Sequence, residues 1–291
     1  MTDTAARTAA ERHTGVRATG TRPLASEATV VDLEDGRAVV VKRGSGPGAA
    51  SAEAAGLRWL GEPGDVPIPT VHGVDDDHLV LDHVPEGRPD RDAAEAFGRG
   101  LARLHLRGAP AFGSPPPGGP REAWIGLARM LNEPHDDWPS FYARCRVQPY
   151  VRQGVNQGLF SPGEAEVFDE VCARLPDLAG PPEPPARLHG DAWSGNVHWA
   201  TDGRVWLLDP AAHGGHRETD LAMLRLFSAP LLDHVLGAYR EAAHDLGRPL
   251  ASGDERRVPL HQLFPLLVHT VLFGGGYARQ ALAAARAALR D

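Results

Sequence analysis

The segment that most constrains this chain is the loop His189-Gly-Asp-Ala-Trp-Ser-Gly-Asn196, because an apolar segment that ends at Asp209 follows it closely. In phosphoryl transfer one aspartate accepts the proton of the attacking hydroxyl, and an asparagine and a later aspartate hold Mg²⁺ against the nucleotide phosphates. Mg²⁺ takes hard oxygen ligands, and the base must be a carboxylate within reach of a hydroxyl. The pattern therefore predicts a phosphoryl-transfer site with Asp191 as catalytic base and Asn196 and Asp209 as metal ligands. Two ordinary turns that each begin with Asp are the alternative.

The first part of the chain is rich in short β-type segments. Residues 28–33 and 38–42 flank an Asp-Gly turn and predict a β-hairpin. A helix is expected over residues 52–60, and two further strands are expected at 70–74 and 78–82, joined by a tight turn of three aspartates. This alternation is typical of a small antiparallel sheet with one helix inserted.

The pattern becomes helical after Pro85. Apolar residues recur at helical spacing over residues 97–104 and again over 164–175. The 291 residues suffice for one large domain or two modest ones. The sequence therefore predicts an α+β protein with a protein-kinase-like, two-lobed fold. Residues 1–84 would form the β-rich nucleotide-binding lobe, and residues 85–291 the larger helical lobe for catalysis and substrate.

The small lobe should supply the other half of an ATP site. Lys42 ends a strand that reads Val-Val-Val-Lys, and Glu53 follows on the next helix. In kinases such a lysine contacts the α- and β-phosphates and is held by a helix glutamate. The connector Asp82, His83 and Val84 is expected to border the adenine with its backbone. A solvated strand-end lysine and a helix-surface glutamate are the alternative.

The loop that normally covers the phosphates is weak in this sequence. Kinases place a glycine-rich loop between their first two strands, whereas residues 15–28 hold only Gly15 and Gly20. No Walker A sequence occurs, which excludes a P-loop kinase. The missing glycines predict a shortened loop and weaker ATP binding, and they leave open a pseudokinase that no longer holds ATP productively.

Composition excludes several other classes of function. The net charge of −8 argues against nucleic acid as a partner. Cys145 and Cys172 have no metal-ligand or redox spacing and are expected to be buried free thiols in a reducing compartment. The most apolar run, 263–276, contains Pro265 and His269 and is too short to span a membrane. The N-terminus lacks the apolar stretch of a signal peptide, so we expect a cytoplasmic protein without a membrane partner.

Residues 188–196 and 209–223 resemble the fructosamine kinase (ketosamine-3-kinase) family, which is related to aminoglycoside phosphotransferases and choline kinases. The similarity covers almost the whole chain. Its specific parts are Trp-Ser-Gly-Asn and Gly-His-Arg-Glu-x-Asp-Leu-Ala, because aminoglycoside kinases share the His-Gly-Asp and the Asn but not these neighbours. The sequence departs from the family pattern at Ala192, where the family usually has Leu, and before Ala28, where the paired glycines are missing.

The resemblance implies roles that the chemistry alone leaves open. His189 would buttress the catalytic loop, and Asp220 would accept hydrogen bonds from its backbone. Four further residues would lie near the substrate: Trp193, His216, Arg217 and Glu218. For these four, a packed loop tryptophan and a salt-bridged loop are the alternatives.

The activity that the resemblance implies is ATP- and Mg²⁺-dependent phosphorylation of a sugar hydroxyl, O3, of a ketosamine such as a fructosamine or ribulosamine. The phosphorylated sugar would then leave spontaneously and return a free amine, which is deglycation of a small metabolite or of a protein lysine. An aminoglycoside or amino-alcohol kinase of the same fold is the first rival, because fold alone does not choose the substrate. A pseudokinase is the second. The sequence does not indicate the oligomeric state.

Overall fold

The small lobe is built on one antiparallel sheet. The computed structural model describes residues 2–290, and its sheet has the strand order β1-β2-β3-β5-β4. The strands are β1 (Ala18–Ala25), β2 (Ala28–Leu33), β3 (Ala38–Arg43), β4 (Val71–Val74) and β5 (His78–Asp82). The predicted hairpin is confirmed, because β2 and β3 pair antiparallel with Val30 opposite Val40. The turn between them contains Gly36 with a φ of 85°, a left-handed conformation that glycine adopts at low cost.

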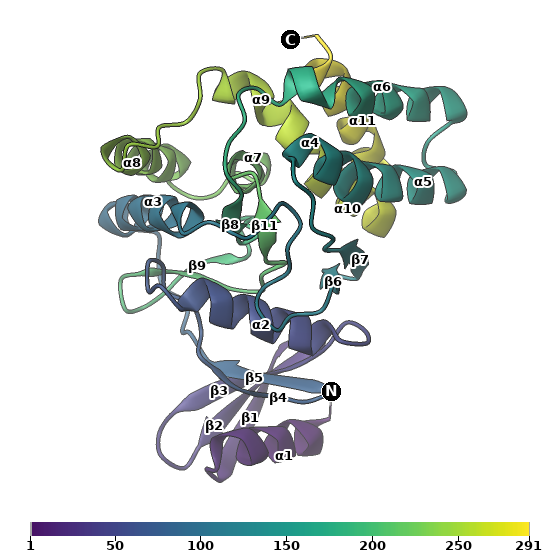
Figure 1. The fold of residues 1–291 in the computed structure, drawn as a ribbon. Coiled ribbons are helices and arrows are strands. Elements are labelled where there is room, and N and C mark those ends of the chain that lie inside the picture. The colour runs from purple at the N-terminus through teal and green to yellow at the C-terminus, as the bar shows by residue number, and fades with distance from the viewer. Residues whose placement is uncertain (1, 291) are drawn as a thin grey trace.

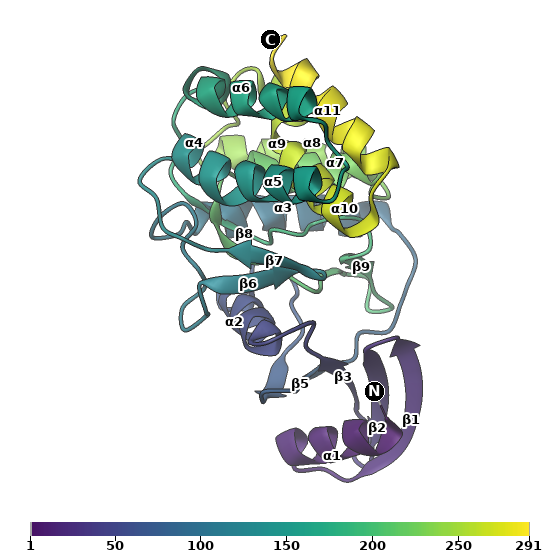
Figure 2. The same ribbon diagram turned by 90° about the vertical axis from the view of Figure 1, so that its right-hand side faces the viewer.

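Two helices cover the two faces of this sheet. Successive strand residues point to opposite faces, so Val39 and Val41 contact helix α1 (Asp3–Thr14), while Leu79 and Leu81 contact helix α2 (Ala49–Gly61). Figures 1 and 2 show α1 on the outer side of the sheet and α2 between the sheet and the large lobe. The sequence analysis predicts the second helix but not α1.

The large lobe is mainly helical. Its helices are α3 (Arg91–Leu106), α4 (Trp138–Phe141), the π-helical turn η1 (Tyr142–Val147), α5 (Gln148–Asn156), α6 (Pro162–Leu178), α7 (Glu218–Leu226), α8 (Leu232–Asp245), α9 (Asp254–His261), α10 (Leu263–Phe273) and α11 (Gly276–Ala288). Three two-stranded ladders complete it: β6 (Glu122–Ile125) with β7 (Ala128–Leu131), β8 (Ala186–Leu188) with β11 (His213–Gly215), and β9 (Val197–Trp199) with β10 (Val205–Leu207). The predicted division into a small antiparallel-sheet lobe and a larger helical lobe is confirmed.

Two apolar cores hold the large lobe together. One joins α4, α5, α6, α10 and α11 at the end remote from the small lobe, and the other joins α3, α7 and α8 to the strands β9 and β10. The ladders lie between these cores and α2 (Figure 1). As a result, the loop between β8 and β9 and the residues after β10 face the small lobe. The exact boundary between residues 84 and 85 stays a prediction.

The contact between α3 and α8 depends on one small residue. Gly98 is buried in α3, and a methyl group there would meet the carbonyl oxygen of Val235 well inside contact distance. We expect Gly98→Ala to lower the free energy of unfolding by about 1–3 kcal/mol, because backbone must move to admit the methyl group. Gly237→Ala on the exposed side of α8 is the matched control. It meets nothing and should stabilise the protein by about 0.5–1 kcal/mol through helix propensity. Urea unfolding checks both, and equal stability of the two variants would contradict this packing.

Candidate active site

A buried carboxylate on α7 holds the loop that connects β8 to β9. Asp220 is fully buried, and it accepts hydrogen bonds from the backbone N–H groups of His189 at 2.8 Å and Gly190 at 2.9 Å. His105 contacts the same carboxylate at 3.3 Å. Burial alone would raise the pKa of Asp220, but the hydrogen bonds and the nearby imidazoles hold that pKa below its ordinary value. These are the backbone contacts that the sequence analysis expects of Asp220, and they fix the start of the loop.

His189 ties this loop to the end of β10. Its Nε2 lies 2.8 Å from the carbonyl oxygen of Leu208, and its Nδ1 lies 3.3 Å from the backbone N–H of Asp191. Burial lowers the pKa of the His189 imidazole, which favours the neutral ring. The tautomer with the proton on Nε2 satisfies both contacts, because Nε2 then donates to the carbonyl and Nδ1 accepts from the N–H. His189 therefore braces two segments and does not face the cavity described below.

Asp191, Asn196 and Asp209 meet at one point. The Asn196 amide nitrogen donates to the Asp191 carboxylate at 3.0 Å and to the Asp191 carbonyl at 2.9 Å, and it lies 3.4 Å from the Asp209 carbonyl. Because the amide nitrogen makes these contacts, the amide oxygen of Asn196 remains available to another partner. Asp209 has a φ of 51°, a left-handed conformation that is uncommon outside glycine and that clusters at functional sites. Burial raises the pKa of Asp191 to about 7, which the hydrogen bond from Asn196 opposes and the charge of Asp209 reinforces.

Lys42 joins the two lobes through an ion pair. Its ammonium lies 2.8 Å from Glu53 Oε1 on α2 and 2.7 Å from Asp209 Oδ1 in the large lobe. Burial would lower the pKa of Lys42, but the two carboxylates outweigh it and raise that pKa above its ordinary value. The lysine is therefore charged. The predicted Lys42–Glu53 pair is present, and it reaches the predicted metal aspartate directly.

One cavity of about 680 Å³ lies between the lobes and collects most of the predicted residues. Those that line it are Lys42, Glu53, Asp82, His83, Val84, Asp191, Trp193, Asn196 and Asp209. Leu24–Ala28, at the turn between β1 and β2, forms one wall, and it belongs to the glycine-poor loop expected to cover the phosphates. Trp124 and Leu127 of the β6–β7 hairpin form another wall, which the sequence did not predict. Gly126 adopts a left-handed φ of 54° at that hairpin turn. A glycine at this position is compatible with a turn, but it does not predict that the hairpin lines the cavity.

The connector after β5 borders the same cavity. The Asp82 carboxylate accepts from the backbone N–H of Thr70 at 3.0 Å and contacts His72 at 2.7 Å, so its side chain serves the sheet. The N–H of His83 donates to Ala38, and the carbonyl of Val84 accepts from His198. Among residues 2–290 the N–H of Val84 donates no hydrogen bond. This N–H therefore remains available to donate to another group at the cavity.

Three of the residues expected near the substrate lie elsewhere. Arg217 is buried and makes two hydrogen bonds of 2.7 Å each to the carboxylate of Glu183. Glu218 is buried and accepts from Arg257 at 2.6 and 2.9 Å. These pairs satisfy both side chains, because a buried charge requires a partner, and neither lines the cavity of Asp191. A contact of Arg217 or Glu218 with the substrate stays a prediction, and neither side chain is placed to make it in that cavity.

His216 reaches a different cavity. It is buried against Trp138 and His261, with ring centroids 5.2 and 4.7 Å away. Together with Trp138 it lines a space of about 860 Å³ beside α4 and α6. Its expected place near the substrate stays a prediction, and the structure places it outside the cavity of Asp191. Only Trp193, which is 38% exposed and lines the first cavity, keeps the expected place.

A Lys–Glu pair in a β-rich lobe that faces an Asp, an Asn and a second Asp across one cavity defines a phosphotransferase of the protein-kinase-like class. The family model described as "Fructosamine kinase" matches residues 24–291. The chain is 36% identical over 236 residues to a protein named probable ketoamine kinase from Thermus thermophilus, which covers 79% of each chain. A crystal structure from Thermobifida fusca, provisionally named a fructosamine-3-kinase, shares 44% identity, covers 98% of both chains and superposes with a TM-score of 0.90. This chain belongs to the fructosamine kinase family.

A more distant solved structure shows how widely the fold is shared. A choline kinase from Streptococcus pneumoniae covers 98% of both chains with a TM-score of 0.62 at 13% identity. Likeness at that level shows the fold alone.

Across residues 2–290, no helix has the length and apolar character needed to cross a membrane.

The Asp220 contacts generate a prediction about stability. We expect Asp220→Asn to lower the free energy of unfolding by about 3 kcal/mol, because an amide nitrogen would face backbone donors that lose their acceptor. Asp202→Asn is the matched control. Its carboxylate pairs with Arg204 at the surface, where an ion pair contributes little. Chemical unfolding measures both variants, and an Asp220→Asn protein as stable as the control would refute the anchoring role.

Proposed function

We propose that this protein transfers the γ-phosphoryl group of ATP to a sugar hydroxyl of a ketosamine such as a fructosamine or ribulosamine. Membership of the fructosamine kinase family supports the substrate class. The single observation that carries the reaction type is the set of Lys42, Asp191, Asn196 and Asp209 around one cavity. The carrier of the sugar is proposed to be a small amine or a protein lysine. A cytoplasmic location stays a prediction.

Asp191 is proposed to act as the general base. Its carboxylate faces the cavity and is oriented by the hydrogen bond from Asn196. As the sugar oxygen bonds to the γ-phosphorus, the hydroxyl proton passes to Asp191 and the bond from phosphorus to the bridging oxygen of ADP breaks. The family resemblance points to the sugar O3 as the attacking oxygen. Transfer needs only positioning and charge stabilisation, because the protein forms no covalent intermediate.

The residues present fit a magnesium ion. The Asp209 carboxylate is 52% exposed and faces the cavity. The amide nitrogen of Asn196 makes hydrogen bonds to the protein, so its amide oxygen remains available to a cation. These are hard oxygen donors, and they leave room for phosphate and water. Asp209 and Asn196 would hold the ion, whose charge would offset the negative charge of the phosphates during transfer. Lys42 is placed to contact the phosphates from the opposite lobe, held there by Glu53.

The adenine is proposed to lie against the connector, where the Val84 N–H donates to the base. The turn Leu24–Ala28 would cover the phosphates. Since it contains no glycine, its backbone approaches a phosphate less freely than the paired glycines of related kinases allow. We therefore propose weaker ATP binding than a glycine-rich loop gives. The full set of polar residues in the cavity favours an active kinase over a pseudokinase.

The first prediction from the proposed function concerns the base. Asp191→Asn should fold normally and bind nucleotide but lose turnover by ~10²–10⁴-fold, because an amide does not accept the hydroxyl proton. Asp32→Asn in β2, outside the cavity, is the control and should keep full activity. Initial rates of ADP release with a ketosamine check both. Turnover of Asp191→Asn above about a tenth of wild type, a threshold set well outside that range, would show that another group is the base.

The second prediction concerns the metal. Mg-ATP should raise the Tm of the wild-type protein, and Asp209→Asn should abolish the Mg²⁺-dependent part of that shift, because one carboxylate ligand is lost. Asparagine tolerates the left-handed backbone at this position better than alanine does, so the folded state should persist. Thermal unfolding with ATP, with and without Mg²⁺, measures the effect. An unchanged shift in the variant would eliminate the metal site, and no shift in the wild type would support a pseudokinase.

The third prediction concerns substrate choice. At saturating Mg-ATP, kcat/KM for fructosyl-lysine or a fructosylated morpholine should exceed that for kanamycin or choline. A site that pairs sugar hydroxyls rejects an acceptor that leaves its polar groups unpaired, at a cost of about 1–3 kcal/mol each. Initial rates on all these acceptors decide the question. If kanamycin or choline outpaces each ketosamine, the substrate class is wrong while the kinase assignment stands.

A further inference from the structure

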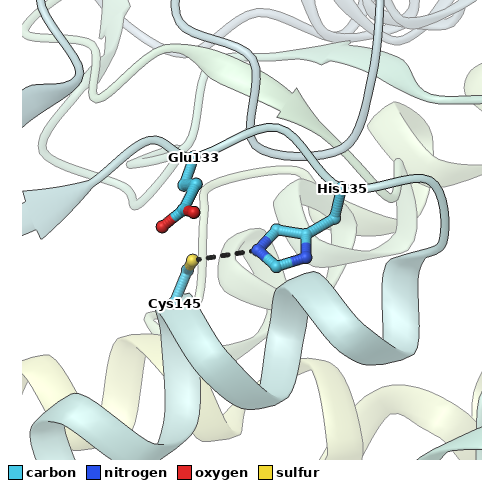
Figure 3. A group of neighbouring side chains, drawn as sticks. All are labelled: Glu133, His135 and Cys145. Carbon is cyan, nitrogen blue, oxygen red and sulfur yellow. Dashed lines mark hydrogen bonds between the residues drawn. The ribbon is translucent and has the colours of Figure 1, made fainter.

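Three potential metal ligands converge outside the proposed active site. Glu133 and His135 lie on the loop between β7 and α4, and Cys145 lies on η1 beneath them (Figure 3). One ligand atom from each residue lies within 4.8 Å of the other two. Figure 3 shows the carboxylate, the imidazole and the thiol directed toward a common point. The sequence analysis found no metal-ligand spacing at Cys145, because the three residues come together only through the fold.

The spacing of these atoms matches a tetrahedral zinc site. Zn–S bonds of about 2.3 Å and Zn–N bonds of about 2.0–2.1 Å, set at a tetrahedral angle, separate the sulfur and nitrogen atoms by about 3.6 Å. Cys145 Sγ lies 3.7 Å from His135 Nε2. The separation of these two atoms therefore suits a zinc ion bound to both. The carboxylate of the exposed Glu133 would supply a third ligand, and a water molecule the fourth.

The fold holds the two segments in register. The backbone N–H of His135 donates to the carbonyl of Phe112 at 2.8 Å. Arg146, the residue after Cys145, donates to the carbonyl of Leu131 and to the side-chain oxygen of Asn132, at 2.7 Å each. The loop that carries Glu133 and His135 is thus tied to η1 just before Glu133, and to the segment of Phe112 at His135. A π-helical turn such as η1 is found frequently at functional sites.

We propose that Glu133, His135 and Cys145 form a binding site for a zinc ion. A thiolate and an imidazole are softer donors than Mg²⁺ prefers, and they suit Zn²⁺. The carboxylate and the thiolate together offset the charge of a divalent ion, which matters beside the Arg146 guanidinium. On binding, the Cys145 thiol releases its proton to solvent as the sulfur–metal bond forms. None of these three residues lines the cavity of Asp191.

A second group of ligand types does not offer the same site. His216, Glu218 and His261 also lie within reach of one another. The Glu218 carboxylate, however, is held by the Arg257 guanidinium at 2.6 and 2.9 Å, and His261 Nδ1 lies 3.0 Å from the Thr219 hydroxyl. A metal there would have to displace a buried ion pair. The cluster of Glu133, His135 and Cys145 has no competing cation within its ligand set.

Zinc at this site would act on the neighbouring cavity through one residue. Asn132 precedes Glu133 and lines the proposed active-site cavity, and it accepts the hydrogen bond from Arg146. A metal ion that joins Glu133 and His135 to η1 would restrain the backbone that follows Asn132. The cluster is therefore placed to stiffen one wall of the cavity.

Cobalt(II) provides a direct test, because it takes zinc sites and gives a thiolate-to-metal absorption band. The chain has only two cysteines, so the band identifies its ligand. The full-length protein without nucleotide is titrated with Co²⁺ in excess Mg²⁺, which occupies sites made of oxygen ligands. Wild type and the matched control Cys172→Ser should bind one Co²⁺ per chain with this band, and Zn²⁺ should displace it.

Two variants separate binding from folding. Cys145→Ser should lose the band, and Glu133→Gln should bind Co²⁺ at least about tenfold more weakly. Glu133 is exposed, so its substitution does not threaten the fold, and circular dichroism verifies that Cys145→Ser is folded. A folded wild type without a thiolate band, a band that persists in Cys145→Ser, or a band lost in Cys172→Ser would each overturn the proposal.

Discussion

The ammonium of Lys42 is the charge on which the arrangement of the two lobes depends. A largely buried cation is stable only with anionic partners, and Lys42 finds one in its own lobe, Glu53, and one in the other, Asp209. The sheet and the helical lobe therefore meet at an ion pair that borders the cavity. Glu62 with Arg187, and Asp65 with Arg103 and Arg107, form further ion pairs between the lobes. At this position Asp209 adopts a left-handed backbone conformation, which is unfavourable for a residue other than glycine. Phosphates that enter the cavity would meet a lysine already held in position.

A second layer of buried charges supports this point from within the large lobe. Asp220 fixes the backbone of the catalytic loop, and Arg217 and Glu218 each take a partner from a distant segment, Glu183 and Arg257 respectively. The charged side chains of the Gly-His-Arg-Glu-x-Asp segment therefore connect several buried parts of the large lobe. This structural role is a reason for that segment to be typical of the family. Breaking one buried partnership leaves a charge without compensation, so the segment tolerates little change.

The sequence predicted correctly those elements that depend mainly on residues close together in the chain. The Asp-Gly turn between β-branched strands gave the β2–β3 hairpin, and the strand-end Lys42 followed by Glu53 gave the ion pair. Position along the chain is a weaker guide to position in space. Arg217 and Glu218 follow Asp209 closely in sequence, but the ladder of β8 and β11 turns them into the core. The β6–β7 wall of the cavity and the cluster around Cys145 depend on long-range packing, which no local pattern encodes.

The most direct measurement of the central claim is the position of the phosphate in the product. A fructosylated amine incubated with the protein and Mg-ATP can be followed by ³¹P and ¹H NMR. We predict a ketosamine phosphorylated at O3, followed by slow release of the free amine as the phosphorylated sugar leaves. A phosphate on another hydroxyl, or ATP hydrolysis without any phosphorylated ketosamine, would contradict the account.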